Sequence, residues 1–143
     1  MLQRFKVTLL VAGLGAASLP AAAQVTPDNF VGGRVSDLAA LCAAGPGDPN
    51  VVSAVNFCHG FLMATGQFHA ALTRPGGKIA PMFCPASPLP TIAAITAGFV
   101  DWARANPQYG GDPAVEGVVR FATAVSPCPT PANRRARAAA RPQ

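Results

Sequence analysis

Four cysteines constrain this chain more than any other feature of its sequence: Cys42, Cys58, Cys84 and Cys128. Their meaning depends on the compartment, because cysteines pair in oxidising spaces and stay reduced in the cytosol. Four cysteines that all pair allow three connectivities. The first question is therefore whether the chain is exported.

The N-terminus has the pattern of a secretory signal peptide over residues 1–23. Arg4 and Lys6 precede an apolar run, and alanines at positions 21–23 satisfy the small-residue rule for cleavage. A membrane anchor is the alternative, but the run is shorter than the roughly 20 apolar residues that a spanning helix needs. We expect a mature chain that begins near Gln24, lies in the periplasm and keeps its cysteines as disulfides.

The net charge of +5 is concentrated at the two ends of the chain. Residues 24–129 hold five basic and six acidic side chains, so this segment is close to neutral. Residues 130–143 hold four arginines and no acid, which predicts a disordered basic tail. A tether to anionic lipid or cell-wall polymer is an alternative role for that tail. The neutral middle segment and an aromatic content of 7% argue against nucleic-acid binding.

Apolar residues recur at helical spacing in four segments of the mature chain. We expect a short helix capped by Ser36, a long helix, and two further helices, over residues 36–44, 49–72, 91–106 and 112–125. Two Asp-Pro pairs, at 48–49 and 112–113, are typical helix starts, because Asp accepts from free N–H groups and Pro has none to satisfy. Gly60 and Gly66 in the long helix suggest close approach by a neighbouring helix.

No segment alternates in the way that a strand does. We therefore predict an all-α domain over residues 24–129, a small disulfide-bonded bundle of about four helices. Three helices with a coil-like N-terminal segment are the alternative. If the third and fourth helices are antiparallel, the start of one lies beside the end of the other. This geometry favours the pair Cys84–Cys128 and leaves Cys42–Cys58.

The sequence gives no support for a metal site, a cofactor or an enzymatic activity. His59 and His69 are ten residues apart, which places them about 80° apart around a helix, and no C-x-x-C motif is present. The motifs of serine hydrolases, zinc proteases and phosphate-binding loops are also absent. We expect a protein that acts by binding.

Several motifs resemble those of one family, the Rap/Tai family of type VI secretion amidase immunity proteins. They are Phe57-Cys58-His59-Gly60-Phe61 followed by Gly66, Phe83-Cys84-Pro85, the stretch 99–107 (FVDWARANP) and the stretch 119–129 (VRFATAVSPCP). The resemblance covers about residues 38–129. The sequence departs from the usual pattern at His59, where an aliphatic residue is common, and in its arginine-rich tail.

The resemblance implies a periplasmic, helical protein with two disulfides that is dimeric in many members. It also implies the partner, a peptidoglycan amidase delivered by the type VI secretion system, whose active-site cleft such proteins block. A different class is the alternative: an acid-stress chaperone of the small helical Hde type, or an envelope adaptor that binds through its arginine tail. The presence of only six carboxylates in the core argues against an acid-triggered chaperone.

An inhibitor of an enzyme cleft needs a protruding and fairly rigid segment. The loop 106–112 is the best candidate, because two prolines flank it and Tyr109 offers an aromatic ring with a polar tip. The candidate contact residues are Asn106, Gln108, Tyr109 and Asp112, with Asp101 and Arg104 on the third helix as a second surface. The alternative is an ordinary helix–helix turn in which Tyr109 folds back on Trp102.

Overall fold

The computed structural model describes residues 24–129 of the chain. The expected signal peptide (1–23) and basic tail (130–143) lie outside the described residues. Four α-helices and two short 3-10 helices account for the regular structure in the described part. In chain order they are η1 (Pro27–Val31), α1 (Val35–Cys42), α2 (Val51–Leu72), α3 (Ile92–Ala105), η2 (Pro107–Tyr109) and α4 (Ala114–Val125). The predicted all-α class with four helices is confirmed.

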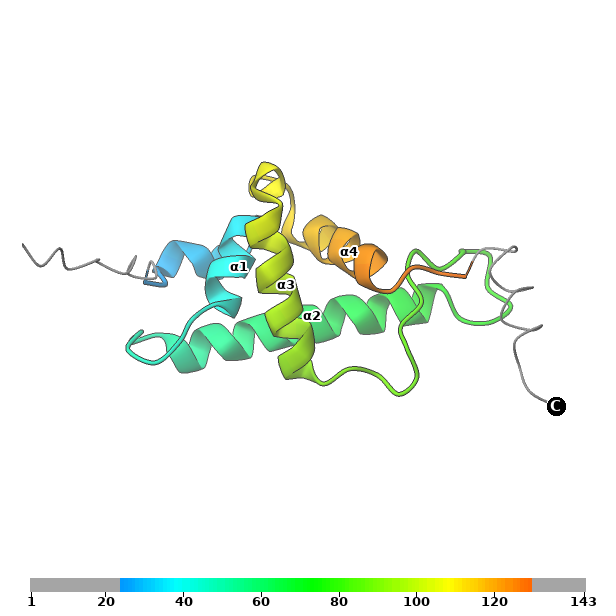
Figure 1. Cartoon of the computed structure of the whole chain (residues 1–143), viewed down its shortest axis with the longest axis horizontal. Helices are drawn as coiled ribbons and strands as arrows, with labels where there is room; N and C mark the ends of the chain where they lie inside the picture. The colour runs from blue at the N-terminus through cyan, green and yellow to red at the C-terminus, as the bar shows by residue number, and fades with distance from the viewer. Residues whose placement is uncertain (1–23, 130–143) are drawn as a thin grey trace, which may run out of the picture.

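Figure 1 shows α2 along the length of the molecule, α3 crossing it, and α1 and α4 on the two sides of α3. Helix α1 is short, but it packs against all three other helices. Its residues Val35, Leu38 and Leu41 are at most 1% exposed. Phe99 from α3 is fully buried in the same core cluster, and Phe121 from α4 packs edge-on against its ring. The shortest helix is thus the centre of the core.

The helix starts differ in detail from the expected ones. Helix α2 begins at Val51 rather than at Pro49, and no side chain caps its first N–H groups, so the expectation that Asp48 does so is wrong. Oδ1 of Asp48 instead accepts a hydrogen bond from the N–H of Asn50, the residue before the helix. The second carboxylate oxygen of Asp48 accepts from the N–H of Val25, which is 4% exposed. One side chain therefore joins the residue before α2 to the first buried residue of the expected mature chain.

Two disulfides join the helices. Cys42 at the end of α1 is bonded to Cys58 in α2, and Cys84 is bonded to Cys128 beyond the end of α4. The second bond fastens the irregular segment 73–91 to the end of α4, where the N–H of Cys84 also donates to the carbonyl of Ser126. The first bond closes a loop that contains the start of α2, and the second closes a loop that contains α3 and α4.

Close helix packing depends on a glycine that the sequence analysis did not single out. A Cβ on Gly117 of α4 would lie 2.3 Å from Cγ2 of Val35, so α1 and α4 approach each other closely only because residue 117 has no side chain. Gly60 and Gly66 of α2 have nothing within 4 Å of such an atom. The expectation that a helix packs closely at these two positions is wrong.

Candidate functional site

The connection between α3 and α4 is a series of tight turns rather than an open loop. The N–H groups of Tyr109, Gly110 and Asp112 each donate to the carbonyl three residues earlier, at 3.0–3.1 Å. Asn106 lies at the end of α3, and its side-chain amide donates to the carbonyl of Trp102 at 2.8 Å. This contact satisfies one of the carbonyls that a helix end leaves without a partner. Asn106 therefore helps to end α3 and start the turn.

The turn is also bound to α1 through the backbone. The N–H groups of Val35 and Ser36 donate to the carbonyls of Asp112 and Gly110 at 2.9 and 3.0 Å. The first N–H groups of a helix have no partner inside that helix, so the turn caps α1. The expectation that Ser36 caps this helix is wrong, because Arg34 is the N-cap residue and Ser36 lies inside α1. The cap fixes the turn to the most buried helix.

Asp112 has a different role from the helix cap expected of it. The N-cap residue of α4 is Pro113, and no side chain accepts from the first N–H groups of that helix. The carboxylate of Asp112 instead faces Arg120, with Oδ2 at 3.9 Å from Nε. The backbone of Gly33 takes over at the helix start, where its carbonyl accepts from the N–H of Ala114.

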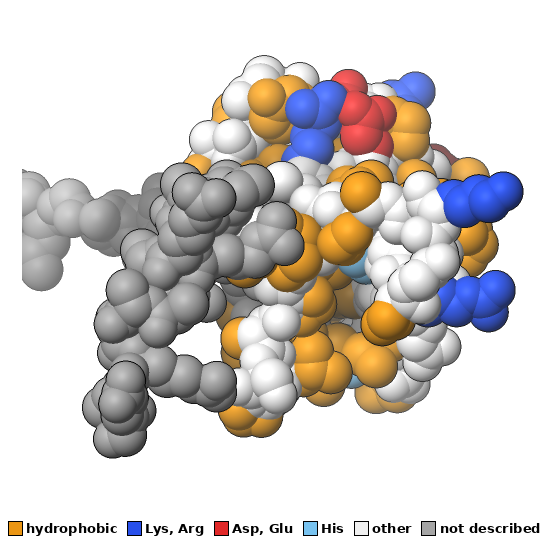
Figure 2. All heavy atoms as spheres, turned by 90° about the vertical axis from the view of Figure 1, so that its right-hand side faces the viewer, with side chains coloured by type: hydrophobic (Ala, Val, Ile, Leu, Met, Phe, Trp, Pro, Cys, Tyr) orange, Lys and Arg blue, Asp and Glu red, His pale blue; other side chains and the backbone are white. Residues whose placement is uncertain are grey.

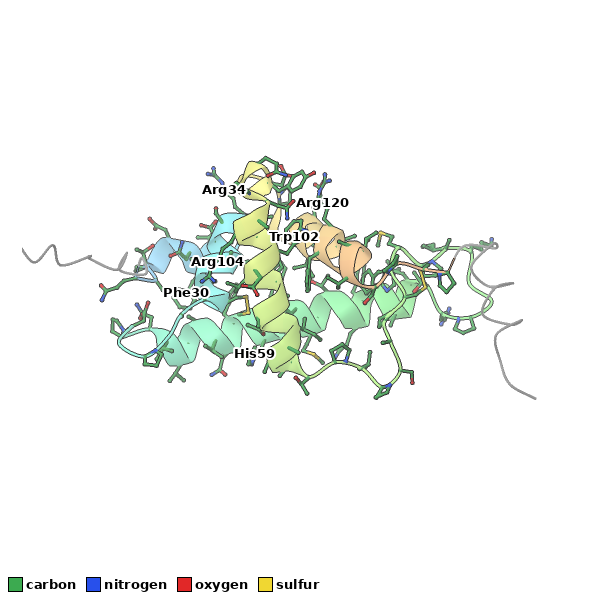
Figure 3. All side chains as sticks on the ribbon, in the orientation of Figure 1. Phe30, Arg34, His59, Trp102, Arg104 and Arg120 are labelled. Carbon is green, nitrogen blue, oxygen red and sulfur yellow. A yellow bond between two sulfur atoms is a disulfide. The ribbon has the colours of Figure 1, made fainter. Side chains whose placement is uncertain are left out.

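An aromatic and cationic cluster supports the turn from the side of α4. The ring of Tyr109 lies parallel to that of Trp102, with centroids 5.9 Å apart. The guanidinium carbon of Arg120 lies 4.5 Å from the centroid of the Tyr109 ring, which is cation–π distance. Figure 3 shows Trp102 and Arg120 on the same side of α3. Tyr109 thus folds back on Trp102, as in the alternative interpretation of the loop.

Arg120 is held in place by two carboxylates. It forms a side-chain hydrogen bond to Glu116, one helical turn earlier, and an ion pair with Asp112. The hydrogen bond to Glu116 raises the pKa of Arg120 above its ordinary value, which is already high enough to keep the guanidinium charged. The charged cluster fixes the orientation of the cation over the Tyr109 ring.

The remaining candidate residues divide into two surfaces. Gln108 is exposed at the tip of the turn, next to the exposed Pro107. Asp101 and Arg104 form an exposed ion pair on α3, with 3.6 Å between Oδ1 and Nη1. Figure 3 shows Arg104 and Trp102 on opposite sides of α3, so this pair lies apart from the aromatic cluster. The structure therefore brings together Asn106, Gln108, Tyr109 and Asp112, and separates Asp101 and Arg104 from them.

Comparison with known families identifies the chain. The model of the Rap1a immunity proteins matches residues 34–128. The chain belongs to this family. The match begins one residue before α1 and ends at Cys128, so it contains all four helices and both disulfides of this Rap1a protein. No curated protein and no solved structure matches the chain.

This Rap1a chain lacks two other kinds of site within its described residues, a metal centre and a membrane-spanning helix. No three of its His, Cys, Asp and Glu side chains in residues 24–129 are grouped closely enough to hold a metal ion. Within the same range, no helix combines the length and the hydrophobicity that crossing a bilayer requires. The two histidines have different environments. His59 is half-buried on α2, and His69 is buried against Phe83.

Sequence reasoning missed one member of the cluster in this Rap1a protein. Arg120 entered only as one of the basic residues, although its spacing of four from Glu116 is the pattern of an ion pair on a helix face. That spacing could have identified the pair. The contact of Arg120 with Tyr109 has no such signal, because it joins two elements across the turn.

Proposed function

We propose that this Rap1a protein is a periplasmic immunity protein that binds and inhibits a peptidoglycan amidase delivered by a type VI secretion system. Membership of the Rap1a family supports the immunity role. The two disulfides support an oxidising compartment such as the periplasm. The amidase and the secretion system rest on the motif resemblance. Inhibition by binding needs no catalytic residue in the inhibitor.

The rigid turn between α3 and α4 is the segment that we propose enters the amidase cleft. Its carbonyls cap α1, and its central ring is packed between neighbours, while Gln108 and Pro107 at the tip stay exposed. A segment that is already ordered loses little conformational entropy when it binds. This combination of a fixed backbone and an exposed tip is the observation that carries the proposal.

The test is inhibition of peptidoglycan hydrolysis by purified mature protein, with the candidate amidase encoded beside it. The variant Gln108→Arg enlarges and charges the tip without touching a buried residue. We expect it to lose about 2 kcal/mol of binding free energy, a roughly 30-fold increase in Kd, because that is the threshold of an interface hot spot. Ser53→Arg, at an exposed position of α2, is the matched control and should bind normally.

A second pair of variants distinguishes the two candidate surfaces. Asp101→Asn and Arg104→Gln change the exposed ion pair of α3, which contributes little to stability because it is solvated. If these two lose affinity and Gln108→Arg does not, the inhibitory surface is the face of α3 and the turn is only a connection. The homodimer implied by the resemblance remains a proposal that sedimentation of the mature protein tests directly.

A further inference from the structure

A half-enclosed groove of about 680 Å³ lies on the side of the molecule away from α1. We name it the α2–α4 groove. The second half of α2, the segment 73–90, α3 and α4 form its walls. Figure 2 looks toward it: hydrophobic side chains line the hollow, a histidine is visible inside, and basic side chains stand at one edge. Its volume is within the range of roughly 300–1,000 Å³ that small-molecule sites have.

The floor and walls of this groove are hydrophobic. Its floor includes Leu62, Phe83 and Phe121, which are 5–7% exposed. Its walls include Leu89 and Val125, which are 72% and 60% exposed. Large apolar side chains that are exposed side by side usually mark a binding surface. The groove thus has a floor of buried apolar side chains and an opening lined by exposed ones.

His69 is the polar residue buried in the groove, and its contacts make it part of the wall. Its Nε2 accepts a hydrogen bond from the backbone N–H of Met82 at 3.1 Å, and its ring stacks on Phe83 with centroids 3.8 Å apart. The imidazole therefore offers the groove a ring surface and fixes the segment 73–90 against α2.

Arg74 is the charged residue among those that line the groove, and no carboxylate lines it. No Asp or Glu occurs between positions 49 and 100 or after position 116, and every residue that lines the groove comes from these two stretches. Arg74 lines the groove, and the exposed Lys78 follows four residues later. A ligand that fits must therefore be apolar along its length and anionic at one end.

We propose that the α2–α4 groove binds a fatty acid with a chain of about 12 carbons. The acyl chain lies on the floor, and the carboxylate meets the guanidinium of Arg74 at the opening, where two parallel N–H···O bonds can form. The basic tail of the chain is a poor occupant, because its arginines would approach Arg74. The proposal adds a ligand site to the proposed immunity function and does not depend on it.

The first measurement is the Kd of the mature protein for saturated fatty acids with 8, 10 and 12 carbons, by calorimetry at concentrations where the acids are monomeric. We expect the Kd to fall about fourfold for each added methylene, which corresponds to about 0.8 kcal/mol per buried CH₂. Dodecan-1-ol should bind at least tenfold more weakly than dodecanoate. An affinity that ignores chain length would overturn the proposal.

Two glycine variants supply a matched pair. Gly66 lines the groove and Gly60 does not, and both have free space where a Cβ would be. Leucine raises helix propensity at either position, so both variants should fold. We expect Gly66→Leu to weaken dodecanoate binding at least tenfold, because its side chain occupies the groove, and Gly60→Leu to bind normally. Equal binding by the two variants would place the ligand elsewhere.

The last experiments test the role of the Arg74 charge and whether a second copy of the chain occupies the groove. Arg74→Gln should remove the preference for dodecanoate over dodecan-1-ol, and Arg104→Gln on α3 should keep it. Sedimentation distinguishes the competing occupant: if the wild type is a dimer that Gly66→Leu dissociates, the groove is an interface between two copies and the fatty-acid proposal is wrong. No effector is present in these experiments, so their failure leaves the amidase proposal untouched.

Discussion

Gly117 is the position where a single added carbon should do the most damage. In the substitution Gly117→Ala, the new Cβ lies 2.3 Å from Cγ2 of Val35 and 3.3 Å from both Cβ and Cγ1 of that residue. Favourable carbon–carbon contact requires about 3.5–4.0 Å, so α1 and α4 must separate by more than 1 Å or Val35 must move. Val35 is 1% exposed and has no free space to enter.

The magnitude follows from two opposing terms. Overpacking a core by one carbon costs about 1–3 kcal/mol. Replacing Gly by Ala in a helix interior stabilises by about 0.5–1 kcal/mol. The net expectation is a loss of up to about 2.5 kcal/mol in the free energy of unfolding, with a central value of about 1 kcal/mol. For a domain of this size, each kcal/mol lowers the Tm by about 4–8 °C.

The assay is thermal and denaturant unfolding of Gly117→Ala with Gly60→Ala as its control. Gly60→Ala adds the same carbon to a helix with nothing within 4 Å, so it should stabilise. In a Val35→Ala background both Cγ contacts are removed and only the 3.3 Å contact with Cβ remains, so Gly117→Ala should cost clearly less than it does in the wild type, which is a coupling that a double-mutant cycle measures. If Gly117→Ala melts at or above the wild-type Tm, the close approach of α1 to α4 is refuted, and with it the account of how the turn is held.

Three further predictions test other parts of the structure. Thiol labelling of the denatured, unreduced mature protein should give no signal, because all four cysteines are bonded; labelling of two or more would contradict the disulfide framework. Ending the chain at Pro129 should leave the Tm unchanged, because residues 130–143 contain no stripe of large apolar residues to bury; a large fall would show that the tail packs on the bundle. Asp48→Ala should cost about 1–2 kcal/mol, measured by urea unfolding, because it removes the acceptors for the N–H groups of Val25 and Asn50; an unchanged midpoint would mean that neither contact stabilises the fold.

The helices were predictable because their signals are local. Apolar spacing and Asp-Pro or Thr starts locate α2, α3 and α4 to within a few residues. Packing partners were not predictable in the same way: Gly60 and Gly66 looked like contact points and are not, whereas Gly117 looked ordinary and is one. A glycine permits close approach, but only the neighbouring helix determines whether the approach occurs.

The burial of individual side chains on the helices was also not predictable from local sequence signals alone. Phe68 and Val125 continue the apolar spacing of α2 and α4, yet they are 66% and 60% exposed. Periodicity identifies the side of a helix that is apolar, and burial also requires an element to cover it. The segment 73–91 leaves the α2–α4 groove open beside Val125 instead of closing it. The exposed part of an apolar stripe therefore indicates a candidate binding surface.

Tyr109 folds back on Trp102, and this packing changes which residue of the turn between α3 and α4 can contact a partner. Tyr109 packs on Trp102 and beneath Arg120, so truncating it removes support from the turn as well as any contact with a partner. Its ring is then a poor probe of binding, because lost affinity and lost order arise together. Gln108, one residue earlier, has an exposed side chain on the same fixed backbone. The part of the turn that can recognise an enzyme cleft is consequently its tip at Gln108. The ring of Tyr109 holds that tip in place.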